Sequence, residues 1–179
     1  MTGYRGRQPR ESLAVIVVLG MLLAGAFTPT ANAADGLYEA LLKATPRQLP
    51  PGFQVRQVAP GPIDQEDRNA GMMGNAQITL LASDPEAKIN YLLFPDMAAA
   101  NAYISQFEKA IVQNKATPRS LANLPAAKCA ETMNGAVCAI DSGRIAVFSM
   151  GSRVDTSAGP LLNAAIDHLN DVIKSNGQQ

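Results

Sequence analysis

Short apolar segments separated by turn residues predict six short strands in this chain. In residues 87–94, Ile89, Tyr91 and Leu93 fall on one side of an extended segment, and Leu92 and Phe94 fall on the other. Comparable patterns predict strands at 53–58, 76–82, 127–131, 136–141 and 144–150. Turn residues at 84–87 and at Ser142-Gly143 separate neighbouring segments, and the second turn predicts that Asp141 lies opposite Arg144. The spacing favours an antiparallel sheet built from hairpins.

Two longer segments follow the spacing of amphipathic helices. The first begins after Pro95-Asp96 and carries apolar residues at Ala100, Tyr103, Ile104, Phe107 and Ile111. The second begins near Ser157, has Pro160 in its first turn and ends at Gly177. Its predicted buried stripe is Leu162, Ala165, Ile166, Leu169, Val172 and Ile173. A short helix capped by Asp35 is also predicted over 37–42.

The two halves of the chain present these elements in the same order. Each half begins with a Leu-Pro pair (Leu49-Pro50 and Leu124-Pro125), continues with three strands and ends with a helix. We therefore expect an α+β fold, with an antiparallel sheet of about six strands and both long helices on one face. A duplicated βββα unit is our hypothesis for its origin. Since one such unit cannot cover its own sheet on both faces, we expect one shared core in a single domain spanning 34–179.

The first 33 residues have the order of a secretory signal peptide. Arg5, Arg7 and Arg10 precede an uncharged apolar run of 15 residues, 13–27, and Ala31-Asn32-Ala33 offers the small residues of a cleavage site. The alternative is an uncleaved membrane anchor, but a spanning helix needs about 20 apolar residues. We therefore expect cleavage after Ala33, export to the periplasm or the extracellular medium, and no stable membrane insertion afterwards.

The charge of the remaining chain argues against a strongly charged partner such as a nucleic acid. The whole chain has 15 basic and 15 acidic side chains, and the leader contains three arginines and one glutamate. The exported part therefore carries two more acidic than basic side chains, and its lysines and arginines are scattered singly. This pattern indicates no nucleic-acid partner.

Cys129 and Cys138 are the only cysteines, and their number and the expected compartment predict a disulfide. The C-x8-C spacing does not match a thioredoxin-like redox motif. A loop over 132–135 places Cys129 opposite Cys138 and Glu131 opposite Ala136. A two-residue turn at Asn134-Gly135 would instead place Cys129 opposite Ile140, so we prefer the first register. The predicted disulfide then bridges a hairpin.

Residues 60–75 read as one long loop rich in glycine and proline, and such loops often bind ligands. Its candidate ligand-binding residues are Asp64, Glu66, Asp67, Asn69, Met72 and Met73. The oxygen-bearing residues could hold Ca²⁺, but Arg68 stands where a further ligand is needed. Two methionines are too few for a Cu(I) site. We therefore predict no metal and no cofactor.

The chain shows no recognised catalytic motif. His168 is the only histidine, and its position beside the apolar stripe of the last helix is typical of a solvated residue. We expect a non-enzymatic module that binds a small ligand or an envelope protein. The alternatives are a hydrolase or another enzyme with an unrecognised site, and a structural or accessory subunit of an envelope complex that pairs through an edge strand.

Overall fold

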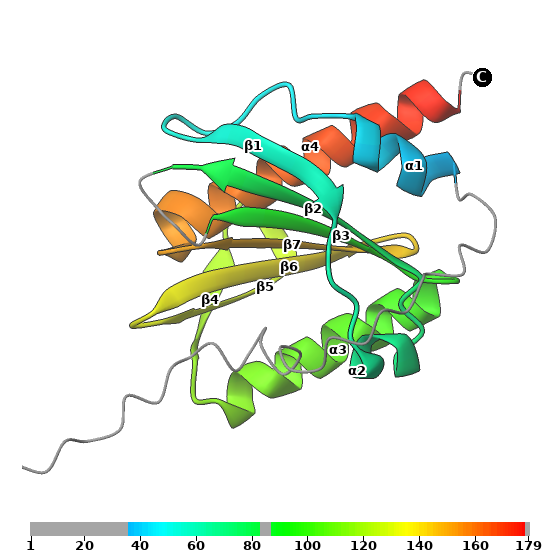
Figure 1. Ribbon diagram of the computed structural model, residues 1–179. Helices are drawn as coiled ribbons and strands as arrows, with labels where there is room; N and C mark the ends of the chain where they lie inside the picture. Colours follow the sequence, from blue (N-terminus) through cyan, green and yellow to red (C-terminus); the bar gives the residue numbers. More distant parts are fainter. Residues whose placement is uncertain (1–35, 83–86, 178–179) are drawn as a thin grey trace, which may run out of the picture.

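The computed structural model describes residues 36–82 and 87–177 (Figure 1). The helices are α1 (Gly36–Lys43), α2 (Gln65–Asn69), α3 (Met97–Gln113) and α4 (Gly159–Asn176), and a π-helical turn η2 (Val154–Ala158) precedes α4. The strands are β1 (Gln54–Pro60), β2 (Gly74–Leu81), β3 (Lys88–Leu93), β4 (Thr117–Leu121), β5 (Leu124–Thr132), β6 (Gly135–Ser142) and β7 (Ile145–Gly151). The predicted signal peptide, the Asp35 cap and most of the 84–87 turn lie outside the described residues.

The seven strands form one antiparallel sheet in the order β1-β2-β3-β7-β6-β5-β4. The fold is α+β, as predicted, and six of the strands match the predicted segments. The prediction of six strands missed β4, because its sequence TPRSL has no apolar alternation and four of its five residues are exposed. Such a polar edge strand buries only Leu121 and leaves no periodic signal.

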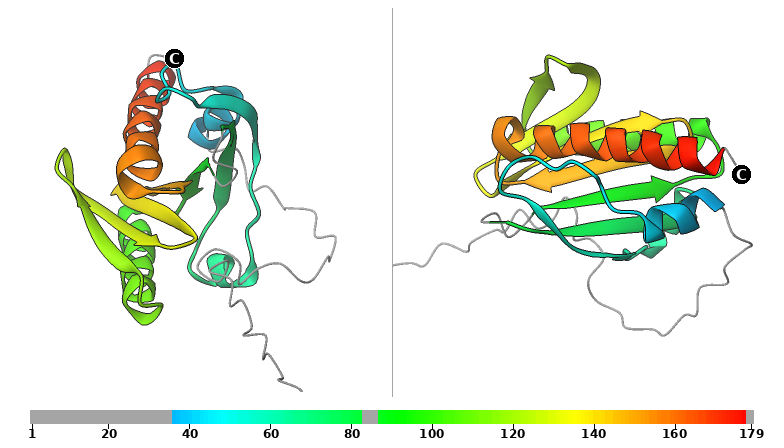
Figure 2. Two further views of the ribbon diagram at one scale, coloured as in Figure 1. Left: turned by 90° about the vertical axis from the view of Figure 1, so that its left-hand side faces the viewer. Right: turned by 90° about the horizontal axis from the view of Figure 1, so that it is seen from above.

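The two long helices lie on opposite faces of the sheet, so the expectation that they share one face was wrong (Figure 2). α4 and α1 pack on one face, which we call the α4-side face, and α3 packs on the other, the α3-side face. The physical reason lies in the central strands. Tyr91 of β3 and Val147 of β7 are buried on the α4-side face, whereas Leu92 and Ala146 beside them are buried on the α3-side face. Both faces therefore need a helix.

The arrangement of the helices also bears on the duplication hypothesis. The order of three strands followed by a helix does occur twice, in β1–β2–β3–α3 and in β5–β6–β7–α4. Two antiparallel halves of a sheet related by a twofold axis would carry their helices on the same face. The opposite placement of α3 and α4 is therefore inconsistent with a symmetric pair of units.

The hairpin registers test two of the predictions. Cys129 pairs with Cys138 and Glu131 pairs with Ala136, as the preferred register predicts. The next hairpin differs from its prediction, because Asp141 pairs with Ala146 and not with Arg144. Gly143 has a φ of 60° and occupies the first central position of the turn, where a type II′ hairpin favours glycine. The turn is therefore Gly143-Arg144 and not Ser142-Gly143.

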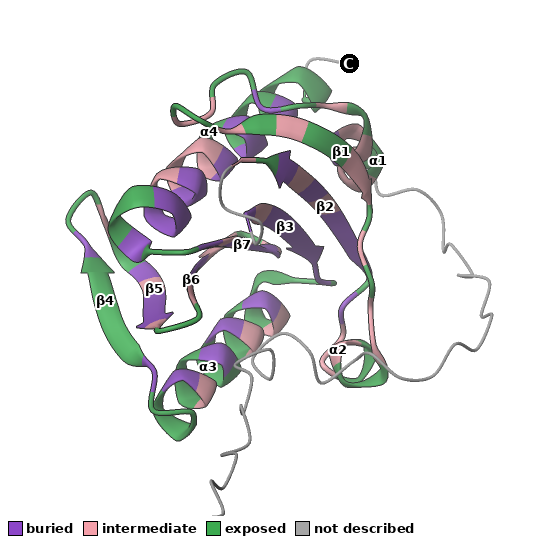
Figure 3. Cartoon of the chain, turned by 60° about the vertical axis from the view of Figure 1, so that its left-hand side comes forward, coloured by how far each residue is buried: buried purple, intermediate pink, exposed green. Residues whose placement is uncertain are grey.

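The boundaries of the long helices follow from their sequence. The Asp96 side chain accepts a hydrogen bond from the Ala99 N–H at 2.8 Å and caps α3, while Pro160 lies in the first turn of α4 and Gly177 ends it. The buried residues of α3 alternate with exposed ones at helical spacing (Figure 3). Within the described ranges, we find no helix that is long and apolar enough to cross a membrane.

Candidate functional site

The predicted long loop contains a short helix. Residues 61–73, which we call the α2 strap, leave the end of β1, pass beside α3 and return to the start of β2 (Figure 1). Asp64 Oδ1 accepts from the Asp67 N–H at 2.8 Å, and the Asp64 N–H donates to Asp67 Oδ2 at 3.3 Å. These two bonds form a capping box around the first turn of α2. The prediction of a loop without secondary structure was wrong, because both carboxylates stabilise a helix start.

The structure does not gather the six candidate residues of this segment into one ligand set. Asp67 Oδ1 also accepts a hydrogen bond from the Tyr103 hydroxyl of α3 at 2.8 Å. Met72 is 6% exposed and packs in the core, whereas Met73 is 53% exposed. Glu66 is exposed, and Asn69 accepts a hydrogen bond from Gln65. Across residues 36–82 and 87–177, no three His, Cys, Asp or Glu side chains group as a metal site would require.

Hydrogen bonds to β2, β3 and α3 fix the α2 strap to the rest of the molecule. The Gly61 N–H donates to the Asn75 carbonyl at 2.7 Å, and Asn75 Nδ2 donates to the Pro62 carbonyl at 3.0 Å. A Cβ at position 61 would lie 2.4 Å from Asn75 Nδ2, so any larger residue would displace the Asn75 side chain from this contact. At the other side, the bond between Tyr103 and Asp67 attaches α2 to α3. The strap therefore borders the α3-side face at a fixed position.

Five polar side chains from three strands form a continuous patch on the α3-side face. Cross-strand pairs place Gln57 beside Thr79, Thr79 beside Lys88, and Gln77 beside Asn90. Gln77 Nε2 donates to Asn90 Oδ1 at 2.9 Å. We call these residues the amide face: Gln57, Gln77, Thr79, Lys88 and Asn90. Gln57 is exposed, three members are partly exposed, and Asn90 is 8% exposed.

The amide face ends at an aromatic border. Phe148 of β7 pairs with Asn90, and Met150 pairs with Lys88; both β7 side chains are partly exposed. The Tyr103 ring meets the Phe148 ring edge to face, with centroids 6.0 Å apart. Beyond this border, Val137 and Ala139 of β6 are buried under α3. One face of one sheet therefore changes from apolar under α3 to mainly polar over β1, β2 and β3, where Leu81 is an exposed apolar exception.

A separate pocket of about 350 Å³ lies along α4. Its lining residues are Arg47, Gln48, Ala164, Asp167, His168, Asn170, Asp171 and Lys174. Arg47 forms an exposed ion pair with Asp171 at 3.8 Å. The four charged side chains are exposed, and such pairs contribute little to stability. The pocket is therefore a polar hollow at the surface and not an apolar cavity between sheet and helices.

His168 is 4% exposed, so the expectation of a solvated residue was wrong. The buried stripe of α4 contains Leu161 and His168, while Ile173 is exposed, so the helix is turned relative to the prediction. The His168 ring meets the Tyr91 ring edge to face at 5.7 Å. Burial lowers the pKa of His168, and Asp171 opposes that change. Its Nε2 atom is buried and has no hydrogen-bond partner among the described residues.

The chemistry of this pocket does not resemble a hydrolytic site. A nucleophilic mechanism needs a hydroxyl or thiol beside an accessible histidine nitrogen. The lining contains no Ser, Thr, Tyr or Cys, and the Nε2 atom of His168 is enclosed. The nearby Tyr91 hydroxyl already donates to the Ala165 carbonyl at 3.1 Å, and burial raises the Tyr91 pKa further above its ordinary range.

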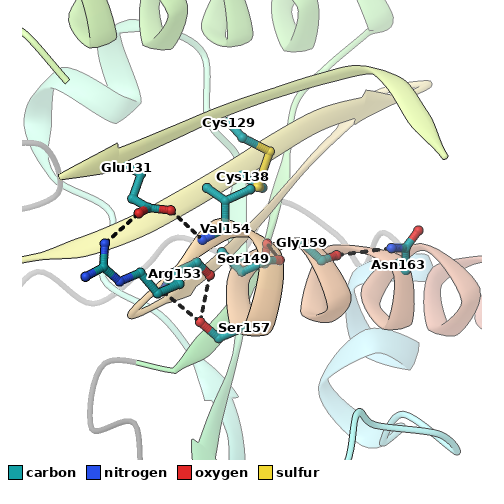
Figure 4. The surroundings of a disulfide bond; sticks show 10 residues. Cys129, Glu131, Cys138, Ser149, Arg153, Val154, Ser157, Gly159 and Asn163 are labelled. Carbon is teal, nitrogen blue, oxygen red and sulfur yellow. Dashed lines mark hydrogen bonds and ion pairs between the residues drawn. A yellow bond between two sulfur atoms is a disulfide. The ribbon is translucent and has the colours of Figure 1, made fainter. Parts of the chain in front are cut away.

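A disulfide joins β5 to β6, and an adjacent carboxylate of β5 binds the start of η2, the turn that precedes α4 (Figure 4). Cys129 and Cys138 are bonded and lie in the α4-side core. Glu131 accepts from the Val154 N–H at 3.0 Å and from the Arg153 guanidinium at 2.7 Å. These two hydrogen bonds lower the Glu131 pKa. The carboxylate thus anchors η2 at its first residue, and both of its oxygens are engaged.

Both edges of the sheet are interrupted. β1 has an irregular register between Val55 and Gln57 and ends at Pro60. β4 contains Pro118 and has an irregular register between Arg119 and Leu121. Short, bulged and proline-bearing edges hinder the addition of a further strand. The described edges are therefore poor surfaces for strand pairing with a partner.

Comparison with protein-family models, curated proteins and solved structures found no match to this chain.

The sequence predicts the position of the strap but does not indicate the amide face. Gln57, Gln77 and Asn90 come from three strands, and only the strand register brings them together. A signal was nevertheless present. In the predicted strand 87–94, the positions of Lys88 and Asn90 are polar, whereas the equivalent side of 136–141 carries Val137 and Ala139. Comparing the same side of every strand would have indicated the change in polarity.

Proposed function

We propose that this chain is an exported, non-enzymatic module that binds a small polar ligand on the amide face. The observation that carries the proposal is the change in polarity along the α3-side face. α3 packs against β5, β6 and β7, while the amide face lies over β1, β2 and β3. The α2 strap and the aromatic border flank this surface, which gives a ligand both polar and apolar contacts.

The composition of the amide face supports binding over simple solvation. A solvated strand face usually carries many ionised side chains, yet this patch holds three amides, one hydroxyl and a single lysine. Asn90 is almost fully enclosed, and burying an amide is costly unless its hydrogen bonds are satisfied. The Asn90 amide oxygen accepts from Gln77, so a polar ligand would bond to the more exposed members of the surface, Gln57, Gln77 and Thr79.

Two other functions receive less support from the described residues. The α4 pocket lacks a hydroxyl or thiol and encloses its histidine nitrogen, which disfavours a hydrolase built on His168. The irregular edges of β1 and β4 disfavour an accessory subunit that adds a strand to its partner. Export is supported by the disulfide, because such bonds persist in oxidising compartments.

A ligand screen with matched variants tests the proposal. Protein purified from the exported fraction is screened by thermal shift against neutral trisaccharides, amino acids, dicarboxylates and short peptides. A hit is then compared in the double variant Gln57→Ala/Gln77→Ala and in the control Gln106→Ala/Gln113→Ala, which changes exposed positions of α3. Loss of the shift in the first variant alone supports the proposal. Equal shifts in both variants, or no hit in any class, overturns it.

The export part of the proposal has its own readout. Mass spectrometry of the exported protein should give an N-terminus at Ala34. An intact Met1 in the membrane fraction would contradict it.

A further inference from the structure

We infer that the ligand of the amide face is a neutral, hydroxyl-rich molecule of the saccharide class. The inference rests on the proposed function and goes beyond it, because it derives the class of ligand from the surface chemistry. Three properties carry it: the hydrogen-bonding character of the side chains, their charge, and the aromatic border beside them.

The hydrogen-bonding groups match alcohols. Gln57, Gln77 and Asn90 each present an amide oxygen that accepts and an amide nitrogen that donates, and the Thr79 hydroxyl does both. A sugar hydroxyl likewise donates one hydrogen bond and accepts others. The Oδ1 atom of the enclosed Asn90 already accepts from Gln77, so a ligand meets mainly the more exposed Gln57, Gln77 and Thr79. Ligands that only accept, such as carboxylates, would not bond to the side-chain oxygens of these residues.

The charge of the surface favours a neutral ligand. Lys88 is the only ionisable side chain of the amide face. An anion would therefore find one cation here and not the two donors that bind an anion in a bidentate way. The α4 pocket provides the contrast, because its lining has two cations and two carboxylates. A charged ligand would therefore find better partners on the opposite side of the sheet.

The aromatic border supplies the apolar contact that a sugar ring needs. Phe148 is partly exposed and lies beside Asn90 through the pairing of β3 with β7. The partly exposed Tyr103 of α3 meets the far side of this border through its ring contact with Phe148. Sugar rings expose C–H groups on their flat faces, and these pack on aromatic rings. Neighbouring strands are about 4.8 Å apart, so side chains in one row lie at a spacing comparable with the width of a sugar ring. Hydroxyls on one ring can thus reach the cross-strand neighbours Gln57 and Thr79 together.

Calorimetric titration with defined probes tests this inference. The neutral probes are maltotriose, cellotriose and N,N′,N″-triacetylchitotriose; the charged and peptide probes are glutamate, citrate, lysine and trialanine. Gln77→Met keeps the shape of the side chain and removes its hydrogen bonds, and Phe148→Leu removes the ring. Gln106→Met on the outer surface of α3 is the control. Thermal melts establish that each variant is folded.

We expect at least one trisaccharide to bind. Gln77→Met should weaken it about three- to tenfold, as expected for one lost hydrogen bond, and Gln106→Met should leave it unchanged. Phe148→Leu should weaken it about two- to tenfold. If only a charged or peptide probe binds and Gln77→Met weakens it, the saccharide inference falls and the proposed function stands. If no probe binds, or if binding is insensitive to Gln77→Met, both fall.

Discussion

Removal of the disulfide should destabilise the chain by an amount that follows from the hairpin geometry. Cys129 and Cys138 lie nine positions apart in the sequence. Closing a loop of this length in the unfolded chain corresponds to about 2.6 kcal/mol at 25 °C in the chain-entropy model. For a domain of this size, such a loss lowers the melting temperature by about 5–10 °C. Both cysteines are buried, so the double variant Cys129→Ala/Cys138→Ala avoids leaving polar groups in the core.

Urea unfolding at 25 °C, followed by circular dichroism, measures this loss directly. The matched control is Met133→Ala at the tip of the same hairpin, where the side chain is 97% exposed and no change is expected. Surface substitutions usually change the free energy of unfolding by less than about 0.5 kcal/mol. If the double variant differs from the parent by no more than this, the loop-closure reasoning is refuted. Such a result would mean that the cross-strand hydrogen bonds already restrict the unfolded hairpin.

Three further predictions follow from individual contacts. Burial lowers the pKa of His168 below its ordinary 6.5, so near that pH the folded state binds fewer protons than the unfolded state. The contribution of His168 to the free energy of unfolding is therefore complete above pH 6.5 and is lost as the pH falls through the folded pKa. In urea unfolding, His168→Phe should lose less stability than the parent between pH 7.5 and pH 5. Tyr103→Phe should lower the free energy of unfolding by about 1 kcal/mol, because the hydrogen bond to Asp67 is lost. In a variant that already carries Asp67→Ala, Tyr103→Phe should cause no further loss. Asp96→Ala should lower the free energy of unfolding by about 1 kcal/mol in thermal melts, because it removes the cap of α3. Asp96→Ser can still cap the helix and should keep most of that stability.

The parts of the fold with strong periodicity could be predicted from sequence. β3 and β7 are largely apolar runs bounded by turn residues, and α3 repeats its apolar residues at helical spacing, so the sequence predicts all three. β4 and α2 were missed because both are short and polar, and their formation depends on a neighbouring strand and on a capping box. The spacing of apolar residues indicates which residues are buried but not which element covers them. The sequence therefore does not show which face of the sheet each helix covers.

The candidate site depended even more on tertiary arrangement. In the sequence, the acidic residues of the strap are candidate ligand-binding residues. In the structure, Asp64 and Asp67 cap α2, and Asp67 also binds Tyr103. His168 was placed on the wrong side because a single polar residue beside an apolar stripe does not reveal a small rotation of the helix. Gln57, Gln77 and Asn90 carry no motif, and they form a surface only through the pairing of β1, β2 and β3.

Side-chain amide signals in two-dimensional NMR offer the most direct view of where a ligand binds. In ¹⁵N-labelled protein titrated with the trisaccharide probes, we expect the amide signals of Gln57, Gln77 and Asn90 to move together and saturably, while those of Gln106 and Gln113 on α3 stay fixed. If the signals that move belong instead to Gln48 and Asn170 beside His168, or if none moves, the amide face is not a ligand-binding surface.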